Sequence, residues 1–503
     1  MILETLNNPE KSPKHPAVTR LLEAAEHYVS PKYLNKNRNP WRKKDDSVLE
    51  FIPEQYDTAD PFNHKYDGKV WVPKGNPDSV MPDALDLNNL KFISKEKAQE
   101  ALDRLEEFTR DIKSSEQLSL VIGTGGTIAM SLQNGELIPK LDTDAILEFA
   151  GQRLRNQFRL TGLEFPRAMD SSQMCSDFTM DILIAISAIW DKASDNLKKH
   201  FAGFLVTHGT DTLAWSAADM AMALGPNPPF SVAFVGAQQT TEATFSDVAS
   251  NVAFSLKSLS RLKENNINTV MIGIGGTAGA AYSGLGAIKV SDVDAKAFDT
   301  PGHKVLINWS DFGKSGTSNE FLQKSPAKKR EDSFRPLIFS GPRPFFRISP
   351  DQGSNPNAEY QRVLNSPEPV IILESFGTGT AHRDIVEAVM TAAKESGKVV
   401  FLSSPLATGS LDHKYADALY AVERGAIPVE MMPAALAAKI HLAVTMIGVK
   451  DKERFVDFVK NRNYAGEQFA EWKPKNRGTS PGNPFFRIGA PRGFSDVAWT
   501  GTM

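Results

Sequence analysis

Between residues 118 and about 290, short apolar runs alternate with stretches of helical periodicity. LSLVIG precedes a helical pattern near 143–152, and GFLVTHG follows another at 178–196. Further patterns at 212–224 and 245–264 lead into SVAFVGA and TVMIGIGG. Strands that alternate with helices are typical of βαβ units, which predicts a mostly parallel sheet. Ligands in such sheets bind at the carboxyl ends of the strands, and these ends are rich in Gly or Thr here.

A second α/β pattern follows a stretch at 303–365 that we interpret as irregular. Alternation resumes with PVIILES, a helical pattern at 382–397, KVVFLSS and helical patterns near 415–424, 433–446 and 451–461. We therefore expect an α/β fold with a large N-terminal parallel-sheet domain and a smaller C-terminal α/β domain. The expected bounds are 1–115 for an N-terminal extension of unassigned role, 116–340 for the large domain, 365–462 for the small domain and 463–503 for an irregular tail.

The N-terminal extension carries two helical patterns, at about 17–29 and 95–113, and we interpret the second as a connector into the main body. The segment KYLNKNRNPWRKKDD at 32–46 is basic, with aromatic residues between the charges. Such a segment fits a contact with a nucleic-acid backbone or a solvated loop, and we favour the loop.

Composition excludes several classes of protein. The single cysteine, Cys175, rules out an intramolecular disulfide and a cysteine-rich zinc site. The 57 Lys and Arg residues against 60 Asp and Glu give a net charge of -3, which provides no global attraction to nucleic acid. No secretory signal and no long apolar run is visible, so we expect a cytoplasmic protein without a membrane span.

Two motifs follow predicted strands directly. GTGGTIA at 123–129 has adjacent glycines that allow a sharp turn and would present Thr127 at the end of a strand. It matches neither the dinucleotide-binding GxGxxG pattern nor a P-loop, and it also fits a plain tight turn. THGTDT at 207–212 places Thr210 and Asp211 at a helix entrance, where Asp211 would serve either in a site or as a cap.

DSSQM at 170–174 offers two serine hydroxyls, which would bind a carboxylate or cap the next helix. A hydroxyl nucleophile needs a base at neutral pH. His208 is one local choice, and a buried lysine beside an aspartate, its pKa lowered by desolvation, is the other. Composition does not select that lysine.

GTGGTIA and THGTDT together resemble the two signature motifs of the bacterial-type L-asparaginase/glutaminase family, and DSSQM resembles its substrate-binding serine motif. VGAQ at 235–238 and SDVASN at 246–251 resemble its next segment, with Val248 where Gly is usual. In GAIKVSDVDAKAFDTP, Lys289 precedes Phe298 by nine residues, as the catalytic lysine does in the family. The resemblance covers approximately residues 118–450.

The resemblance implies a two-domain α/β amidohydrolase that forms a homodimer or homotetramer and needs no metal or cofactor. It would hydrolyse L-asparagine or a related small amide to the acid and ammonia, with no membrane or nucleic-acid partner. The roles it implies are Thr127 as nucleophile; Thr210, Asp211 and Lys289 as a second catalytic group; Ser171, Ser172, Gly126, Gly209 and Ala237 in substrate binding; and N–H groups near Thr210 and Ala237 for the oxyanion.

Two further departures from the family concern the site. Its mobile loop carries a Tyr that supports the nucleophile, whereas MSLQNGELIPK at 130–140 has none, and Leu137 stands at that position. Glu136 or Ser131 would be the local substitutes. In ESFGTGTAHRD, Thr378 and Thr380 stand where Asn is common, which predicts altered recognition of the substrate's amino group.

Two other functions stay open. The chain would be a subunit of a tRNA-dependent amidotransferase, since the archaeal glutamyl-tRNA(Gln) amidotransferase has a D subunit with an asparaginase-like body. Alternatively, the missing Tyr would mark a catalytically impaired member kept for binding or assembly. We favour the amidohydrolase over both.

Overall fold

A computed structural model defines the fold. It describes residues 64–66, 71–73, 87–133, 136–139, 142–149, 154, 156–225, 228–275, 279–301, 305–313, 336–350, 353–404 and 416–468. The helix expected at 17–29, the basic segment 32–46 and most of the tail lie outside these residues. Strands β1 (His64–Tyr66) and β2 (Trp71–Pro73) form a two-stranded antiparallel sheet.

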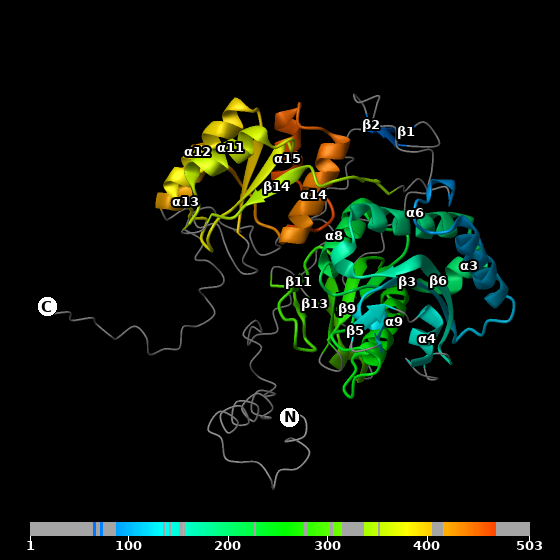
Figure 1. Ribbon diagram of the computed structural model, residues 1–503. Coiled ribbons are helices and arrows are strands. Elements are labelled where there is room, and N and C mark those ends of the chain that lie inside the picture. Colours follow the sequence, from blue (N-terminus) through cyan, green and yellow to red (C-terminus); the bar gives the residue numbers. More distant parts are fainter. Residues whose placement is uncertain are drawn as a thin grey trace, which may run out of the picture. The chain divides into compact units, whose positions relative to one another are not determined.

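The large sheet has seven strands in the order β13-β10-β9-β8-β7-β3-β6. Figure 1 labels four of them, β13, β9, β3 and β6. Five neighbouring strands run parallel: β6 (Phe158–Met169), β3 (Gln117–Gly125), β7 (Phe201–Thr207), β8 (Val232–Val235) and β9 (Val270–Ile274). β10 (Ala280–Ser283) lies antiparallel to both β9 and β13 (Val305–Asn308). The predicted, mostly parallel sheet is confirmed.

Helices pack against the sheet, and the apolar side chains between them form two buried clusters. α3 (Lys95–Phe108), α6 (Ser176–Lys192) and α8 (Leu213–Leu224) contribute to one, and α4 (Thr143–Phe149) and α9 (Val248–Glu264) contribute to the other. The helix expected at 178–196 ends at Lys192, because Ser194 caps a separate short helix, α7 (Asp195–His200), with its side chain.

The predicted connector helix α3 is part of the core. Its Ala98, Ala101 and Leu105 are buried in the same cluster as α6. The segment before it is held by Asp181 of α6, whose carboxylate accepts the backbone N–H groups of residues 91–93 at 2.6–3.0 Å. The part of residues 1–115 that the structure describes from Leu87 onward therefore packs into the large unit.

The second sheet has four parallel strands in the order β14-β15-β16-β17. They are β14 (Phe345–Ile348), β15 (Val370–Glu374), β16 (Val399–Ser403) and β17 (Ile427–Pro428). The accompanying helices are α11 (Pro356–Asn365), α12 (Arg383–Glu395), α13 (Ala416–Glu423), α14 (Pro433–Met446) and α15 (Lys452–Asn461). The stretch 303–365, predicted as irregular, thus contains β13, β14 and α11, and the last two belong to the smaller unit.

Two buried ion pairs hold segments onto helices. Arg343 donates two hydrogen bonds, of 2.9 and 2.8 Å, to the buried carboxylate of Asp219 on α8. Lys439 of α14 and Glu467 are both fully buried and form an ion pair. Glu467 also accepts the backbone N–H groups of Tyr464 and Ala465. Residues 464–467, expected to begin the irregular tail, are therefore fixed onto α14.

Candidate active site

Four neighbouring parallel strands end at the predicted site. Thr127 follows β3 in a 3-10 turn, η5 (Thr127–Ala129), and Ser171 follows β6 in η6 (Ser171–Gln173). Thr210 follows β7, and Ala237 follows β8. Because the carboxyl ends of parallel strands share one edge of the sheet, the loops that carry these residues lie together.

Glycines let three of these loops touch. Gly126 has a φ of 79°, which favours glycine, and a Cβ atom there would lie 2.2 Å from the backbone nitrogen of Gly209. A Cβ atom on Gly209 would lie 2.5 Å from Oγ of Ser171. The hydroxyl of Thr212 donates to the Ser171 carbonyl at 2.7 Å. The GTGGTIA, THGTDT and DSSQM motifs are thereby packed into one cluster.

Lys289 lies in β11 (Ile288–Lys289), which pairs with β12 (Phe298–Asp299) so that Lys289 faces Phe298 in register. Its ammonium donates to Oγ1 of Thr210 at 3.0 Å and to Oδ1 of Asp211 at 2.6 Å. It forms a second ion pair with Asp292, also at 2.6 Å. The structure therefore brings Thr210, Asp211 and Lys289 together, as the sequence predicts.

The charge state of Lys289 differs from the sequence-based expectation. Desolvation alone would lower the pKa of its amine, but hydrogen bonds and charge attraction from Asp211 and Asp292 outweigh it and raise that pKa. Lys289 is thus an ammonium ion in this state, rather than a lysine poised to accept a proton. Asp211 is not a helix cap either, because Thr212 is the N-cap residue of α8.

Gln238 completes the environment of Thr210. The Thr210 hydroxyl donates to Oε1 of Gln238 at 3.3 Å, and Nε2 of Gln238 donates to the Ser291 carbonyl at 3.0 Å. The buried carboxylate of Asp247 accepts the backbone N–H groups of Gln238 and Gln239 at 2.9–3.1 Å. Asp247 therefore fixes the turn after β8, and Gln238 links that turn to the lysine loop.

Thr127 has a free hydroxyl within the described part of the chain. Its side chain is half-buried, and it forms no hydrogen bond with another described residue, whereas the Thr210 hydroxyl is engaged on both sides. The backbone N–H groups of Thr210 and Ala237 likewise donate to no described residue. One hydroxyl and two backbone N–H groups at the carboxyl ends of the strands therefore have no hydrogen-bond partner among the described residues.

His208 is not a base. Its Nδ1 lies 2.7 Å from the Gly209 carbonyl, which accepts only, so Nδ1 carries the proton and Nε2 accepts from the Ser216 hydroxyl at 2.9 Å. Burial lowers the pKa of His208 to about 4, with the hydrogen bond to Gly209 opposing the shift. His208 is a neutral residue that ties the THGTDT loop to α8.

The two serines differ in exposure. Ser171 is buried against Gly209, whereas Ser172 is exposed and accepts a hydrogen bond from the Gln173 amide at 3.3 Å. Neither caps α6, whose N-cap residue is Cys175. Asp170 caps η6 by accepting the Ser172 N–H at 2.8 Å.

The two departures from the family pattern fall in ordered backbone. β4 (Met130–Gln133) and β5 (Glu136–Pro139) form an antiparallel pair in which Leu137 is opposite Leu132. Thr380 closes a turn after β15, since its carbonyl accepts the N–H of Phe376 at 2.8 Å. Val248, where the family has Gly, is buried at the start of α9.

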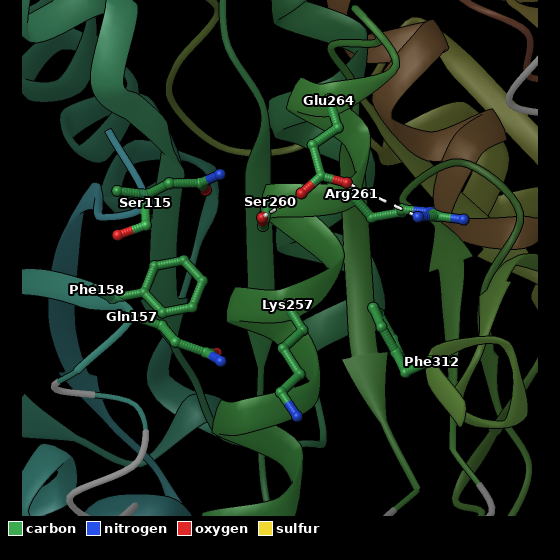
Figure 2. Close-up of a pocket in the computed structure, with 9 residues that line it drawn as sticks. Ser115, Gln157, Phe158, Lys257, Ser260, Arg261, Glu264 and Phe312 are labelled. Atoms are coloured by element: carbon green, nitrogen blue, oxygen red, sulfur yellow. Dashed lines mark hydrogen bonds and ion pairs between the residues drawn. The ribbon is translucent and has the colours of Figure 1, made fainter. Parts of the chain in front are cut away.

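A pocket of about 380 Å³ lies at the opposite edge of the large sheet. Gln117 and Phe158, which begin β3 and β6, line it together with Lys257 and Arg261 of α9 (Figure 2). Because it lies at the amino ends of these strands, it is separate from the loop cluster around Thr127. Across the residues described, no group of three His, Cys, Asp or Glu side chains is placed to hold a metal ion.

Sequence reasoning missed Asp292, Gln238 and Asp247. Asp292 lies three residues after Lys289, so it was detectable once Lys289 had been chosen as the candidate lysine. Gln238 and Asp247 lie in segments that matched the family, yet nothing in their spacing predicts a contact with Thr210 or with the turn after β8.

The described residues form an α/β protein whose loop cluster lies at the carboxyl ends of parallel strands. Residues 119–320 match the family model "Asparaginase, N-terminal", so this part of the chain is similar to the asparaginase family. The L-asparaginase of Thermococcus kodakarensis is 25% identical over 360 residues, which cover 69% of this chain and 98% of that protein. In none of the helices that the structure describes is there an apolar stretch long enough to cross a membrane.

Other relatives carry a different name. The D subunit of the glutamyl-tRNA(Gln) amidotransferase of Metallosphaera sedula is 25% identical over 442 residues, 83% of this chain and 95% of that protein. Among solved structures, the thermostable L-asparaginase of Thermococcus kodakarensis matches with a TM-score of 0.56 at 23% identity, over 70% of this chain and 99% of that chain. L-asparaginase I of Vibrio cholerae matches with the same TM-score at 22% identity, over the same shares.

Proposed function

We propose that this protein hydrolyses the side-chain amide of L-asparagine or a related small amide through a threonine nucleophile. The Thr127 oxygen attacks the amide carbon, the carbon–nitrogen bond breaks, and the amide nitrogen leaves as ammonia with the hydroxyl proton. Water then cleaves the ester, which releases the acid and restores the hydroxyl. The observation that carries this proposal is that the Thr127 hydroxyl has no hydrogen-bond partner among the described residues, while its loop contacts the loop that holds Thr210 and Asp211.

The surrounding donors suit this reaction. The N–H groups of Thr210 and Ala237 are free to stabilise the developing oxyanion, a role typically worth about 10²–10³ in rate. The hydroxyls of Ser171 and Ser172 would bind the carboxylate of the substrate. Gly126 and Gly209 would let the substrate approach the backbone, since neither places a side chain in its way.

Lys289 and Thr210 would move the proton. In the ammonium form, Lys289 donates to the Thr210 oxygen and cannot accept a proton from it. Once Lys289 is neutral, its lone pair can draw the Thr210 proton, and Thr210 can in turn accept one from the attacking group or from water. Asp211 would stabilise the lysine when it becomes charged again.

Ammonia release by the purified full-length chain tests the proposal, with L-asparagine, L-glutamine and D-asparagine as separate substrates and no tRNA present. We expect release from at least one of them and its loss in Thr127→Ala. A chain that folds and binds L-asparagine in a calorimeter but releases no ammonia would instead be the impaired family member that the missing Tyr suggests.

A second candidate is an ammonia-supplying subunit of a tRNA-dependent amidotransferase. The coverage of nearly the whole Metallosphaera sedula relative favours it. This function predicts that glutamine is the preferred amide and that hydrolysis is accelerated by a partner protein and a charged tRNA. Equal ammonia release with and without these additions would contradict it.

For the amidohydrolase we propose a homodimer or homotetramer. Sedimentation measures this oligomeric state directly.

A further inference from the structure

We infer that Asp292 is a positioning residue that holds Lys289 as an ammonium ion and so sets the pH at which that lysine can accept a proton. The catalytic part of this inference rests on the proposed function. The effect of Asp292 on the protonation of Lys289 does not rest on the proposed function, and it is tested separately.

The geometry places two carboxylates on one ammonium. Oδ1 of Asp211 and Oδ1 of Asp292 each lie 2.6 Å from Nζ of Lys289, and the third partner is the Thr210 oxygen at 3.0 Å. An ammonium group has three donors, so these contacts occupy all of them. Lys289 is therefore saturated by acceptors in this state.

A local turn sets the position of Asp292. Oγ of Ser291 accepts the backbone N–H groups of Val293 and Asp294 at 3.1 and 3.0 Å. This closes the chain just after Lys289 and returns the Asp292 side chain toward it. The same Ser291 offers its carbonyl to Gln238, so the turn is tied to the loop after β8.

The charged groups that act on Lys289 come from two segments. Asp211 approaches from the entrance of α8, and Asp292 approaches from the turn that follows Lys289 itself. The Lys289 side chain is only 19% exposed, whereas that of Asp292 is 83% exposed. Asp211 already supplies the carboxylate that the reaction needs, so Asp292 adds a second charge that favours only the protonated lysine.

The first experiment measures the charge of Lys289 without activity. Trace acetylation with acetic anhydride, read by mass spectrometry across a pH series, follows the neutral fraction of each amine, with the exposed Lys296 as internal reference. We expect Lys289 in Asp292→Asn to become reactive at lower pH than in the wild type. Asp294→Asn is the matched control, because it removes an exposed carboxylate from the same turn that forms no ion pair with Lys289. Coincident curves for the wild type and Asp292→Asn would overturn the inference.

The second experiment measures ammonia release against pH. On the acid side of the profile, Asp292→Asn should be about two- to five-fold faster than the wild type, since an exposed ion pair contributes only modestly. Its rising limb should move to lower pH, and that of Asp294→Asn should not. If Asp292→Asn shifts the pH dependence of Lys289 acetylation but leaves the pH dependence of ammonia release unchanged, the catalytic part of the inference is overturned. The effect of Asp292 on the protonation of Lys289 would then still stand. An inactive wild type would refute the proposed function, and the labelling would still decide whether Asp292 holds Lys289.

Discussion

The backbones of Gly126 and Gly209 are in direct contact, although they belong to different motifs and follow different strands. Thr127 and Thr210 are the next residues in each chain segment. This contact, rather than any side-chain interaction, fixes how far the two threonines stand apart.

Replacing Gly126 with alanine should therefore destabilise the protein by more than its backbone strain alone. Gly448 is a control for a positive φ in open space, because its φ is 75° and no atom lies within 4 Å of an added Cβ, whereas Gly126 combines its φ of 79° with a ψ of −179°. Gly448→Ala should cost about 1–2 kcal/mol for the left-handed conformation. Gly126→Ala should cost more in urea unfolding, because its Cβ would collide with Gly209. Equal costs for the two variants would contradict the contact.

Thr127→Ala should reduce ammonia release by roughly 10⁴-fold or more, as expected when a nucleophile is removed. The stability should change little, because the hydroxyl forms no hydrogen bond with a described residue. Thr127→Ser keeps the hydroxyl and should retain part of the rate. Ammonia assays combined with thermal melting distinguish loss of the nucleophile from loss of the fold. Wild-type rates in the alanine variant would refute the covalent mechanism.

Leu137→Tyr tests the missing aromatic hydroxyl. General acid–base assistance is typically worth about 10²–10⁴ in rate, so the wild type should be slow on L-asparagine and this variant faster under saturating substrate. Glu136→Gln is the companion variant, and it should slow the wild type only if Glu136 supplies the proton transfer instead. A fast wild type that neither change affects would show that another residue fills this role.

Stability should fall as the pH drops from about 6.5 to 4. Burial lowers the pKa of His208 to about 4, and burial together with nearby Arg343 lowers the pKa of His441 to about 4. The unfolded chain therefore binds more protons in this range, and the contribution of each histidine, roughly 3 kcal/mol, is complete only above pH 6.5.

Urea unfolding at intervals of pH measures this slope. The His441→Gln variant, which removes one of the two groups, should have a shallower slope than the wild type between pH 4 and 6.5. A variant with an unchanged slope would show that His441 is not held neutral in the folded state.

The sequence predicts the interior of the fold better than its edges. β7, β8 and β9 are buried along their whole length, so they read as continuous apolar runs. Of the strands that were not predicted, β6, β13, β14 and β17 lie at an edge of their sheets, whereas β10 lies between β9 and β13. An edge strand has one neighbour and is less completely buried: at the start of β6, Phe158 is buried whereas Arg159 is partly exposed.

The site shows a similar division. Thr127 and Thr210 were predictable because glycine-rich turns at strand ends are visible in the sequence. Lys289 was found only through its spacing to Phe298, since β11 has two residues and no pattern of its own. Asp211 and Asp292 together raise the pKa of Lys289, and the contact with Asp292 arises from the turn around Ser291, which residue order alone does not reveal.

The buried pair of Lys439 and Glu467 has a consequence for where this chain can be cut. Removal of the chain beyond Arg462 would leave the ammonium of Lys439 enclosed without its carboxylate, a loss of about 3–5 kcal/mol. A gene fusion joined at the end of α15 would carry the same defect. A shortened form of the protein should therefore extend past α15 to Glu467, so that Lys439 keeps its carboxylate partner.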